Sequence, residues 1–167
     1  MKRRLGAVLL VITMTVFMLT GCGTEKTPKL EGSCVEIMEQ VYGSAELEES
    51  FREAMAYYET NTVSDDMEEY VLGTDELDYI DSAYSAPLMS AQAYQCVIVR
   101  LEPDEDVLKA KQMLLDHADP RKWICVEAES VVVENVGDVI LYVMADQATA
   151  DALKTAFLAL GETESAN

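Results

Sequence analysis

The sequence predicts an α+β domain in which N-terminal helices precede a β-α-β-β-α unit. Three apolar, β-branched segments predict the strands, at 94–101, 123–133 and 139–145. Between and after them, apolar residues recur at helical spacing in 107–118 and in 150–160. A right-handed crossover would make the first two strands parallel, and a hairpin would add an antiparallel neighbour. We therefore expect a small mixed sheet with helices packed on one of its faces.

Capping signals mark the first predicted helix. Ser33 and Glu36 have the spacing of a capping box, and the apolar residues that follow lie on one helical face. Gly43 is expected to end this helix. Residues 45–58 also have helical spacing, with an extended conformation over 57–63 as the open alternative.

Polar and charged residues bound the remaining elements. A short acidic helix is predicted for 65–72, and a loop or single turn for 74–81. Acidic residues at 104–106 favour the start of the next helix, because the positive end of the helix dipole attracts negative charge. Asp146 is expected to cap the final helix, and Gly161 to end it.

The length and composition predict one globular domain, which we place at 33–161. Half of the 167 residues are hydrophobic, and the polar segment 162–167 is expected to be a disordered tail. The formal net charge is −19, from 12 basic and 31 acidic residues. Such a surface repels nucleic acid phosphates and anionic lipid headgroups, so we expect no nucleic acid partner. Any attachment to a membrane must then be covalent or hydrophobic.

The N-terminus has the pattern of a secretory signal peptide. Three basic residues at 2–4 precede an uncharged apolar run at 5–18. This run is too short to span a bilayer, which needs about 20 helical residues. Removing residues 1–21 would leave 9 basic residues against 31 acidic ones, a net charge of −22.

The motif Leu19-Thr20-Gly21-Cys22 resembles the lipobox of bacterial lipoproteins. The resemblance implies cleavage after Gly21 and a diacylglycerol thioether on Cys22. Two or more acyl chains, such as palmitate, would hold the protein stably on the extracytoplasmic face of the cell membrane. Residues 22–32 are rich in Gly, Thr, Pro and charge, and are expected to form a flexible tether.

Several segments together resemble the small lipoproteins of domain-of-unknown-function family 4358, found in Gram-positive bacteria. Besides the lipobox, these segments are 70–78, 97–100, 119–124 and 157–160. The resemblance covers nearly all of the mature chain and implies a membrane-anchored extracytoplasmic protein. It implies no catalytic or ligand-binding residue.

The histidine and the cysteines form no catalytic motif. His117 lies between Asp116 and Asp119, late in a predicted helix, and no nucleophile motif accompanies it. A catalytic role for His117 therefore competes with that of a cation stabilised at a helix C-terminus. Cys96 and Cys125 are the one pair that we consider for a disulfide, and the alternative is that the cysteines are small buried hydrophobes.

Acidic residues gather at 65–69, 75–81 and 104–106. Ca²⁺ prefers several carboxylate oxygens that converge from one loop, and 74–81 is the best candidate. Its spacing does not match the calcium-binding loop, so a solvated acidic face is expected instead of a metal site. Paired carboxylates for glycoside hydrolysis must be buried or mutually coupled, and the sequence indicates no such pair.

Arg121, Lys122 and Trp123 are the candidate ligand contacts. They hold the one pair of adjacent basic residues in an acidic domain, beside the sole tryptophan. Arg and aromatic residues are over-represented at binding hot spots, so this junction is a candidate to receive an acidic or aromatic ligand group. The alternative is that Trp123 covers the core while its neighbours balance the local charge.

These observations predict a membrane-anchored binding or interaction module of the cell envelope, without enzymatic activity or a cofactor. Its partner would be an envelope protein or a small ligand. Two alternatives stay open, namely an envelope hydrolase that uses acidic residues or His117, and a small solute-binding protein. The second requires two lobes around a solute, for which 146 residues after removal of 1–21 leave little room.

Overall fold

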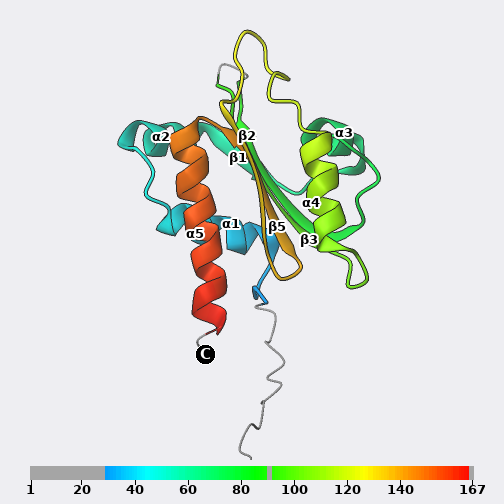
Figure 1. The fold of residues 1–167 in the computed structure, drawn as a ribbon. Helices are drawn as coiled ribbons and strands as arrows, with labels where there is room; N and C mark the ends of the chain where they lie inside the picture. The colour runs from blue at the N-terminus through cyan, green and yellow to red at the C-terminus, as the bar shows by residue number, and fades with distance from the viewer. Residues whose placement is uncertain (1–28, 90–91, 166–167) are drawn as a thin grey trace, which may run out of the picture.

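The computed structural model describes residues 29–89 and 92–165, which form a five-stranded sheet flanked by helices (Figure 1). The strand order is β1-β2-β3-β5-β4, and every neighbouring pair is antiparallel. The predicted α+β class is confirmed. In chain order, the elements are α1 Cys34–Ser44, α2 Glu49–Ala54, the 3-10 turn Met55–Tyr57, β1 Tyr58–Asn61, the 3-10 turn Asp65–Met67, α3 Glu68–Val71, β2 Tyr79–Pro87, β3 Gln95–Leu101, α4 Val107–Asp116, β4 Ser130–Val136, β5 Val139–Ala145 and α5 Gln147–Ser165.

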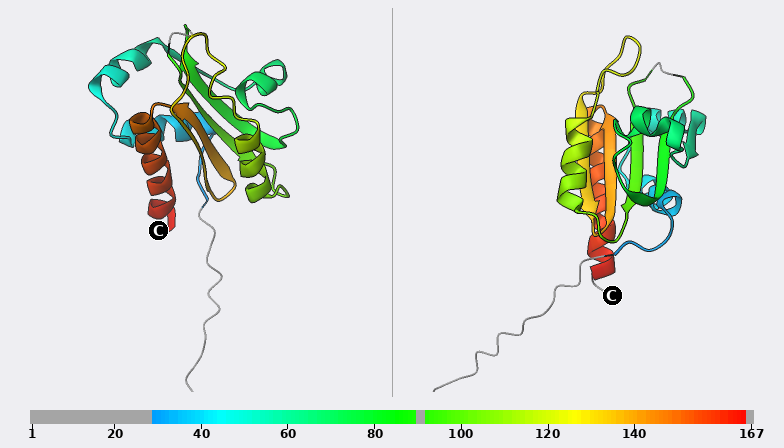
Figure 2. Two further views of the ribbon diagram at one scale, coloured as in Figure 1. Left: turned by 45° about the horizontal axis from the view of Figure 1, so that its top comes forward. Right: turned by 90° about the vertical axis from the view of Figure 1, so that its right-hand side faces the viewer.

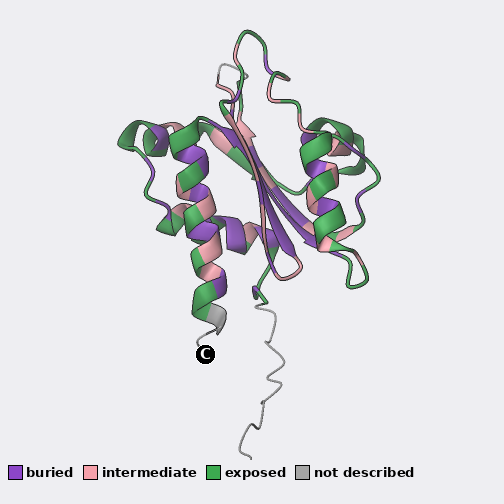
Figure 3. Cartoon of the chain, viewed as in Figure 1, coloured by how far each residue is buried: buried purple, intermediate pink, exposed green. Residues whose placement is uncertain are grey.

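Helices cover both faces of the sheet, with α1 and α5 on one face and α3 and α4 on the other (Figure 2). All seven residues of β3 and of β5 are buried (Figure 3). Alternate residues of a strand point to opposite faces. On β3, Cys96 and Ile98 pack with α1 and α5, whereas Val97 and Val99 pack with α4. The expectation of helices on one face is wrong, because a strand that is apolar at successive positions needs cover on both sides.

The predicted mixed sheet is also wrong. β3 and β4 run in the same direction on either side of the crossover through α4, but they are not neighbours. The β4–β5 hairpin returns β5 into the position between them, where it pairs with both. β5 is buried along its whole length and β4 is mostly half-buried, so the more apolar strand occupies the centre and β4 forms an edge.

Two further strands extend the sheet beyond β3. β1, which covers Tyr58–Asn61, confirms part of the extended alternative for 57–63, and β2 begins inside the loop predicted at 74–81. β2 was not predicted because it carries Ser82 and Ser85 at buried positions instead of an apolar run. The Ser82 hydroxyl accepts a hydrogen bond from the backbone N–H of Val63 at 3.0 Å, which satisfies this polar group inside the protein.

The predicted N-terminal helix caps are confirmed. In the capping box of α1, Ser33 N donates to Glu36 Oε2 at 2.8 Å and Glu36 N donates to Ser33 Oγ at 3.3 Å. At the other predicted cap, Asp146 Oδ1 accepts from Thr149 N at 2.9 Å at the start of α5. The start of α4 lies just after the acidic residues 104–106, as expected, and Asp106 is also its N-cap, which was not predicted. These contacts satisfy N–H groups that have no partner within the helix.

The predicted helix ends are less accurate. Gly43 lies inside α1, and α5 continues through Gly161 to Ser165. At Gly161 a Cβ would lie 2.7 Å from Val136 Cγ1, so glycine allows the helix to approach β4 closely. Residues 162–165 belong to α5 and are helical, whereas the sequence predicts a disordered tail there. Residues 166–167 lie outside the described residues. No described helix has both the length and the apolarity needed to cross a bilayer.

Three predicted elements are shorter than expected. The helix predicted at 45–58 is reduced to α2 and one 3-10 turn, and that at 65–72 to a 3-10 turn followed by α3. The strand predicted at 123–133 starts only at Ser130, where β4 begins to pair with β5. Trp123 lies in the loop before β4 and is buried, so this apolar side chain packs in the core although the residue is not part of a strand.

The chain enters the domain through contacts with Arg100. The Arg100 guanidinium donates to the backbone oxygens of Leu30 at 3.0 Å and Gly32 at 2.8 Å, and lies 3.4 Å from the Asp138 carboxylate. Leu30 is 3% exposed and packs in the core with α1 and α5. The tether predicted at 22–32 is thus too long, because its last residues are held against the domain. The predicted signal peptide at 1–21 and the start of the predicted tether lie outside the described residues.

The three cysteines within the described residues are free. Cys34 and Cys96 are buried and Cys125 is exposed, so the disulfide considered between Cys96 and Cys125 is not formed. Burial raises the pKa of the Cys96 thiol to about 12. Burial and the nearby Asp81 carboxylate raise the pKa of the Cys34 thiol to about 12 as well.

We expect a maleimide to modify Cys125 and to spare Cys34 and Cys96 in the folded protein near neutral pH. The thiolate is the reactive form, and burial keeps both inner thiols protonated. Peptide mapping by mass spectrometry after a short incubation measures the modified positions. The same reaction in denaturant should label Cys34, Cys96 and Cys125 alike. Fast labelling of Cys34 or Cys96 in a folded Cys125→Ala variant would contradict their buried placement.

Candidate functional site

A small pocket lies between α3, the C-terminal end of α4 and the last part of β5. Its volume is about 220 Å³. It brings together His117 and Lys122, two of the residues that the sequence singled out. The described lining consists of Glu69, Tyr70, Val71, Gly73, His117, Asp119, Lys122, Tyr142 and Met144.

Gly73 lets the segment after α3 pack against the end of α4. Its φ is +81°, and a Cβ at this position would lie 2.4 Å from the backbone oxygen of His117. His117 is the C-terminal cap residue of α4, and its backbone N–H donates to the Met113 oxygen at 3.1 Å. Glycine supplies both the left-handed backbone and the missing side chain, so this contact places α3 beside His117.

Lys122 connects α3, β3 and the loop after α4. Its ammonium donates to the backbone oxygen of Tyr70 at 2.6 Å and to the side-chain oxygen of Gln95. Gln95 is fully buried at the start of β3, and its amide donates to the backbone oxygen of Val71 at 2.9 Å. Lys122 and Gln95 thus satisfy carbonyl groups at the end of α3, which as a single helical turn has few internal partners for them.

The charge of Lys122 has no carboxylate within salt-bridge distance among the described residues. Its Nζ instead lies 4.2 Å from the ring centroid of Tyr70 and 5.5 Å from that of Trp123. Burial lowers the pKa of Lys122 to about 8, because the ammonium loses hydration, and the charge of Asp119 acts in the opposite direction. Lys122 therefore changes its charge much closer to neutral pH than an exposed lysine does.

Tyr142 provides a second hydrogen-bond donor in the pocket. The residue is 1% exposed, and its hydroxyl donates to the Met144 thioether sulfur at 3.5 Å. A thioether is only a weak acceptor. Burial, with a smaller contribution from the Asp119 charge, raises the pKa of Tyr142 far above that of an exposed tyrosine. The phenol thus keeps its proton and stays a donor.

The other two candidate contacts lie outside the pocket lining. Arg121 is exposed, and Trp123 is 7% exposed within the core that includes α4. The placement of Trp123 agrees with the interpretation that it covers the core. His117 is exposed at the C-terminal end of α4, where the helix dipole stabilises positive charge. The described lining contains no serine or cysteine that His117 would activate.

The acidic residues of the segment 74–81 are exposed or accept hydrogen bonds from the backbone. In the part of the chain that the structure describes, no three His, Cys, Asp or Glu side chains group closely enough to hold a metal ion. Asp81 instead accepts hydrogen bonds from the backbone N–H groups of Cys34 at 2.7 Å and Ser82 at 2.9 Å. Asp75, Glu76 and Asp78 are exposed, as expected for a solvated acidic face.

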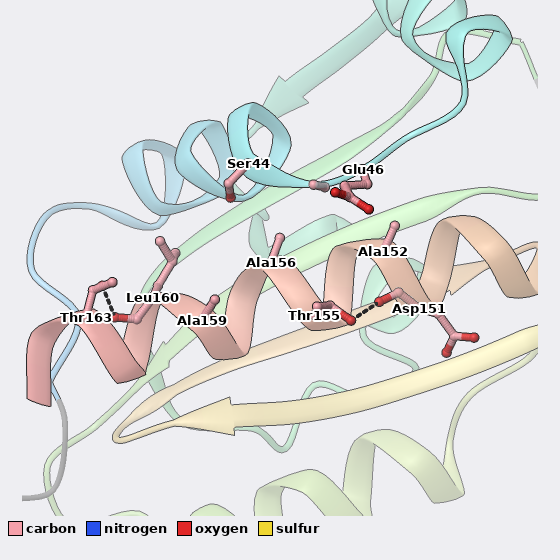
Figure 4. A pocket seen from close by; sticks show the side chains of 10 residues that line it. Ser44, Glu46, Asp151, Ala152, Thr155, Ala156, Ala159, Leu160 and Thr163 are labelled. Atoms are coloured by element: carbon pink, nitrogen blue, oxygen red, sulfur yellow. Dashed lines mark hydrogen bonds between the residues drawn. The ribbon is translucent and has the colours of Figure 1, made fainter.

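A second hollow of about 510 Å³ lies between α5 and the segment that joins α1 to α2 (Figure 4). Its lining includes Leu160 and several alanines, so most of its surface is apolar. The Thr155 hydroxyl donates to the backbone oxygen of Asp151 at 2.8 Å and is satisfied within its own helix. The Ser44 hydroxyl likewise donates to the Gln40 backbone oxygen at 2.8 Å, so these two hydroxyls are less suited to orient a small ligand.

Gln95, Tyr70 and Tyr142 were not predicted from the sequence as members of the site. A glutamine at the start of an apolar strand is the one available signal, because a buried amide requires hydrogen-bond partners. Tyr70 and Tyr142 lie on elements far apart in the chain, and no local pattern indicates that they meet. The chain has no significant match among protein-family models, curated proteins or solved structures.

Proposed function

We propose that this protein is a lipoprotein anchored on the extracytoplasmic face of a cell membrane, where its domain binds a partner protein or small ligand of the envelope. The observation that carries the proposal is the N-terminal pattern of basic residues, a short apolar run and the motif Leu19-Thr20-Gly21-Cys22. The resemblance to family 4358 supports the same location and stays a prediction.

The docking of Leu30 supports a short connection between domain and membrane. Residues 23–29 are the seven that separate Cys22 from Leu30. Leu30 is buried in the core, and Arg100 binds its backbone oxygen. Because an extended chain spans at most about 3.5 Å per residue, a lipid on Cys22 would keep Leu30 within roughly 30 Å of the bilayer surface.

The pocket at Lys122 lies away from this attachment. Arg100, which holds Leu30, and Gln95, which binds Lys122, are near opposite ends of β3. With a rise of about 3.4 Å per residue, the two positions are roughly 17 Å apart along the strand. The segment before α1 enters at the lower end of the sheet in Figure 1, and α4 ends at the upper end. A domain tethered in this way would present the pocket to the space beyond the membrane.

A binding role fits the described geometry better than the two alternatives do. A hydrolase in which His117 activates a side-chain nucleophile needs a serine or cysteine beside it, which the described lining of its pocket does not contain. The two carboxylates of the lining, Glu69 and Asp119, are exposed and lack the burial that tunes catalytic acids. A receptor with two lobes around a solute is also disfavoured, because the described strands form one sheet.

The intact mass of the membrane-extracted protein tests the anchor. We expect the native chain to lack residues 1–21 and to carry acyl chains, because the lipobox directs both steps. Cys22→Ala is expected to lose the acyl chains and to keep residues 1–21. Cys125→Ala, the matched change of a domain cysteine, should be processed like the native chain. An unlipidated native chain that retains its N-terminus would contradict the proposal.

A further inference from the structure

Lys122 differs from the other partly buried lysines in having neutral partners alone. Lys111 and Lys154 both contact the Glu134 carboxylate, at 3.1 Å and 2.7 Å. Lys122 donates to two neutral oxygens and faces aromatic rings. Buried lysines are rarely found without a countercharge, because the loss of hydration is costly. A pocket lined by such an ammonium is suited to an anionic group.

Two donors of this pocket also lack a strong acceptor. An ammonium has three N–H groups, and two of those on Lys122 have hydrogen-bond acceptors among the described residues. The Tyr142 hydroxyl has the Met144 thioether as its acceptor. An oxygen with negative charge would accept from both donors, and such charge-assisted hydrogen bonds are roughly twice as strong as neutral ones.

We propose that this pocket binds a small monocarboxylate, with the carboxylate between the Lys122 ammonium and the Tyr142 hydroxyl. The volume of about 220 Å³ equals that of roughly seven water molecules, so the bound part has about that number of non-hydrogen atoms. Glu69 and Asp119 also line the pocket, and their repulsion of an anion grows with its charge, which disfavours a ligand with a second negative charge. The strongly acidic chain disfavours polyanions in the same way.

This inference rests on the proposed binding function and is independent of the lipid anchor. The mass measurement on Cys22 reports on the anchor and leaves the pocket unchanged. A ligand titration reports on the pocket and does not require lipidation. The two proposals therefore fail separately.

The sole tryptophan provides a local signal for binding, because the Trp123 ring centroid lies 5.5 Å from Lys122 Nζ. The full chain in non-ionic detergent is titrated near neutral pH with sodium acetate, at ionic strength held constant with sodium chloride. Acetamide serves as the neutral probe of the same shape, and inorganic phosphate as the more highly charged one. We expect a saturable fluorescence change with acetate, with a Kd on the order of 10 mM for so small a ligand. Acetamide should give none, and phosphate should bind more weakly than acetate.

Two variants remove the proposed donors one at a time. Lys122→Met is expected to weaken acetate binding by about tenfold or more, and Tyr142→Phe by about threefold. Lys109→Met removes the charge of an exposed lysine on α4, and should bind acetate like the native chain. Circular dichroism checks folding. If Lys122→Met does not fold, Tyr142→Phe provides the test, because the acceptor of its hydroxyl among the described residues is a thioether.

The pH dependence of acetate binding has a defined sign. An anion favours the protonated amine, and the protonated fraction of Lys122 falls as the pH rises through about 8. Acetate is therefore expected to bind about tenfold more weakly at pH 9 than at pH 7. The other ionisable groups that line the pocket are Glu69 and Tyr70 from α3, His117 at the end of α4, Asp119 in the following loop, and Tyr142 from β5.

Three results would overturn the proposal. The first is the absence of a saturable response to acetate, or an equal response to acetate and acetamide. The second is an unchanged acetate affinity in a folded Lys122→Met or Tyr142→Phe variant. The third is tighter binding of phosphate than of acetate, which would contradict the limit of one negative charge.

Discussion

Replacing Gly73 with alanine is expected to lower the free energy of unfolding by about 2–4 kcal/mol, because two costs coincide at this position. A residue with a Cβ loses roughly 1–2 kcal/mol in the left-handed backbone region, and Gly73 has a φ of +81°. The added Cβ would also lie 2.4 Å from the His117 backbone oxygen. Relief of this contact requires α3 to move away from α4, which would also disturb the hydrogen bond from Lys122 to Tyr70.

Gly43→Ala is the matched control, because a Cβ at Gly43 in α1 would meet no atom within 4 Å. Alanine favours a helix over glycine by about 0.5–1 kcal/mol, so this variant is expected to be more stable than the native chain. Urea unfolding followed by circular dichroism measures both changes. A Gly73→Ala variant as stable as the native chain would contradict the close contact between Gly73 and His117.

Replacing Arg100 with methionine is also expected to lower the free energy of unfolding, by about 2–4 kcal/mol. Methionine fills similar space but donates no hydrogen bond. The backbone oxygens of Leu30 and Gly32 and the Asp138 carboxylate would then lose their shared donor. Hydrogen bonds to a charged group contribute about 1.5–3 kcal/mol each, and a buried acceptor left without a partner adds to the loss.

Arg121→Met is the control for Arg100→Met, because Arg121 is exposed and its stability effect is expected to stay within about 0.5 kcal/mol. Urea unfolding again gives the stability of both variants. Limited proteolysis adds a local measurement, because loss of the Arg100 contacts should expose residues 29–33 to cleavage before the rest of the domain. Equal protection of this segment in the two variants would show that Arg100 does not hold it.

The parts of the fold that were predicted correctly depend on residues close together in the chain. The capping box of Ser33 and Glu36 and the cap at Asp146 each join residues within three positions of one another. Such contacts form whatever the rest of the protein does, so a sequence pattern suffices to predict them. Helix ends are harder to predict, as Gly161 shows, because its place inside α5 follows from the approach of Val136 on another element.

The candidate site was predicted in part. Lys122 was singled out from the local sequence, because two basic residues beside the tryptophan are unusual in so acidic a chain. Its contacts with Tyr70 and Gln95 join residues 52 and 27 positions away, which no local pattern indicates. The lowered pKa of Lys122 depends on its partial burial by these distant segments, and among the described residues no carboxylate lies within salt-bridge distance of it.

The sequence by itself determined the α+β class and the starts of the capped helices, because periodicity and capping are local properties. Only the tertiary structure decided that β5 lies between β3 and β4, that helices cover both faces of the sheet, and that Leu30 docks on Arg100. The physical reason is that burial depends on which distant segments meet. β5 takes the central position because it is apolar towards both faces, and Lys122 becomes a partly buried amine because it contacts α3 and β3.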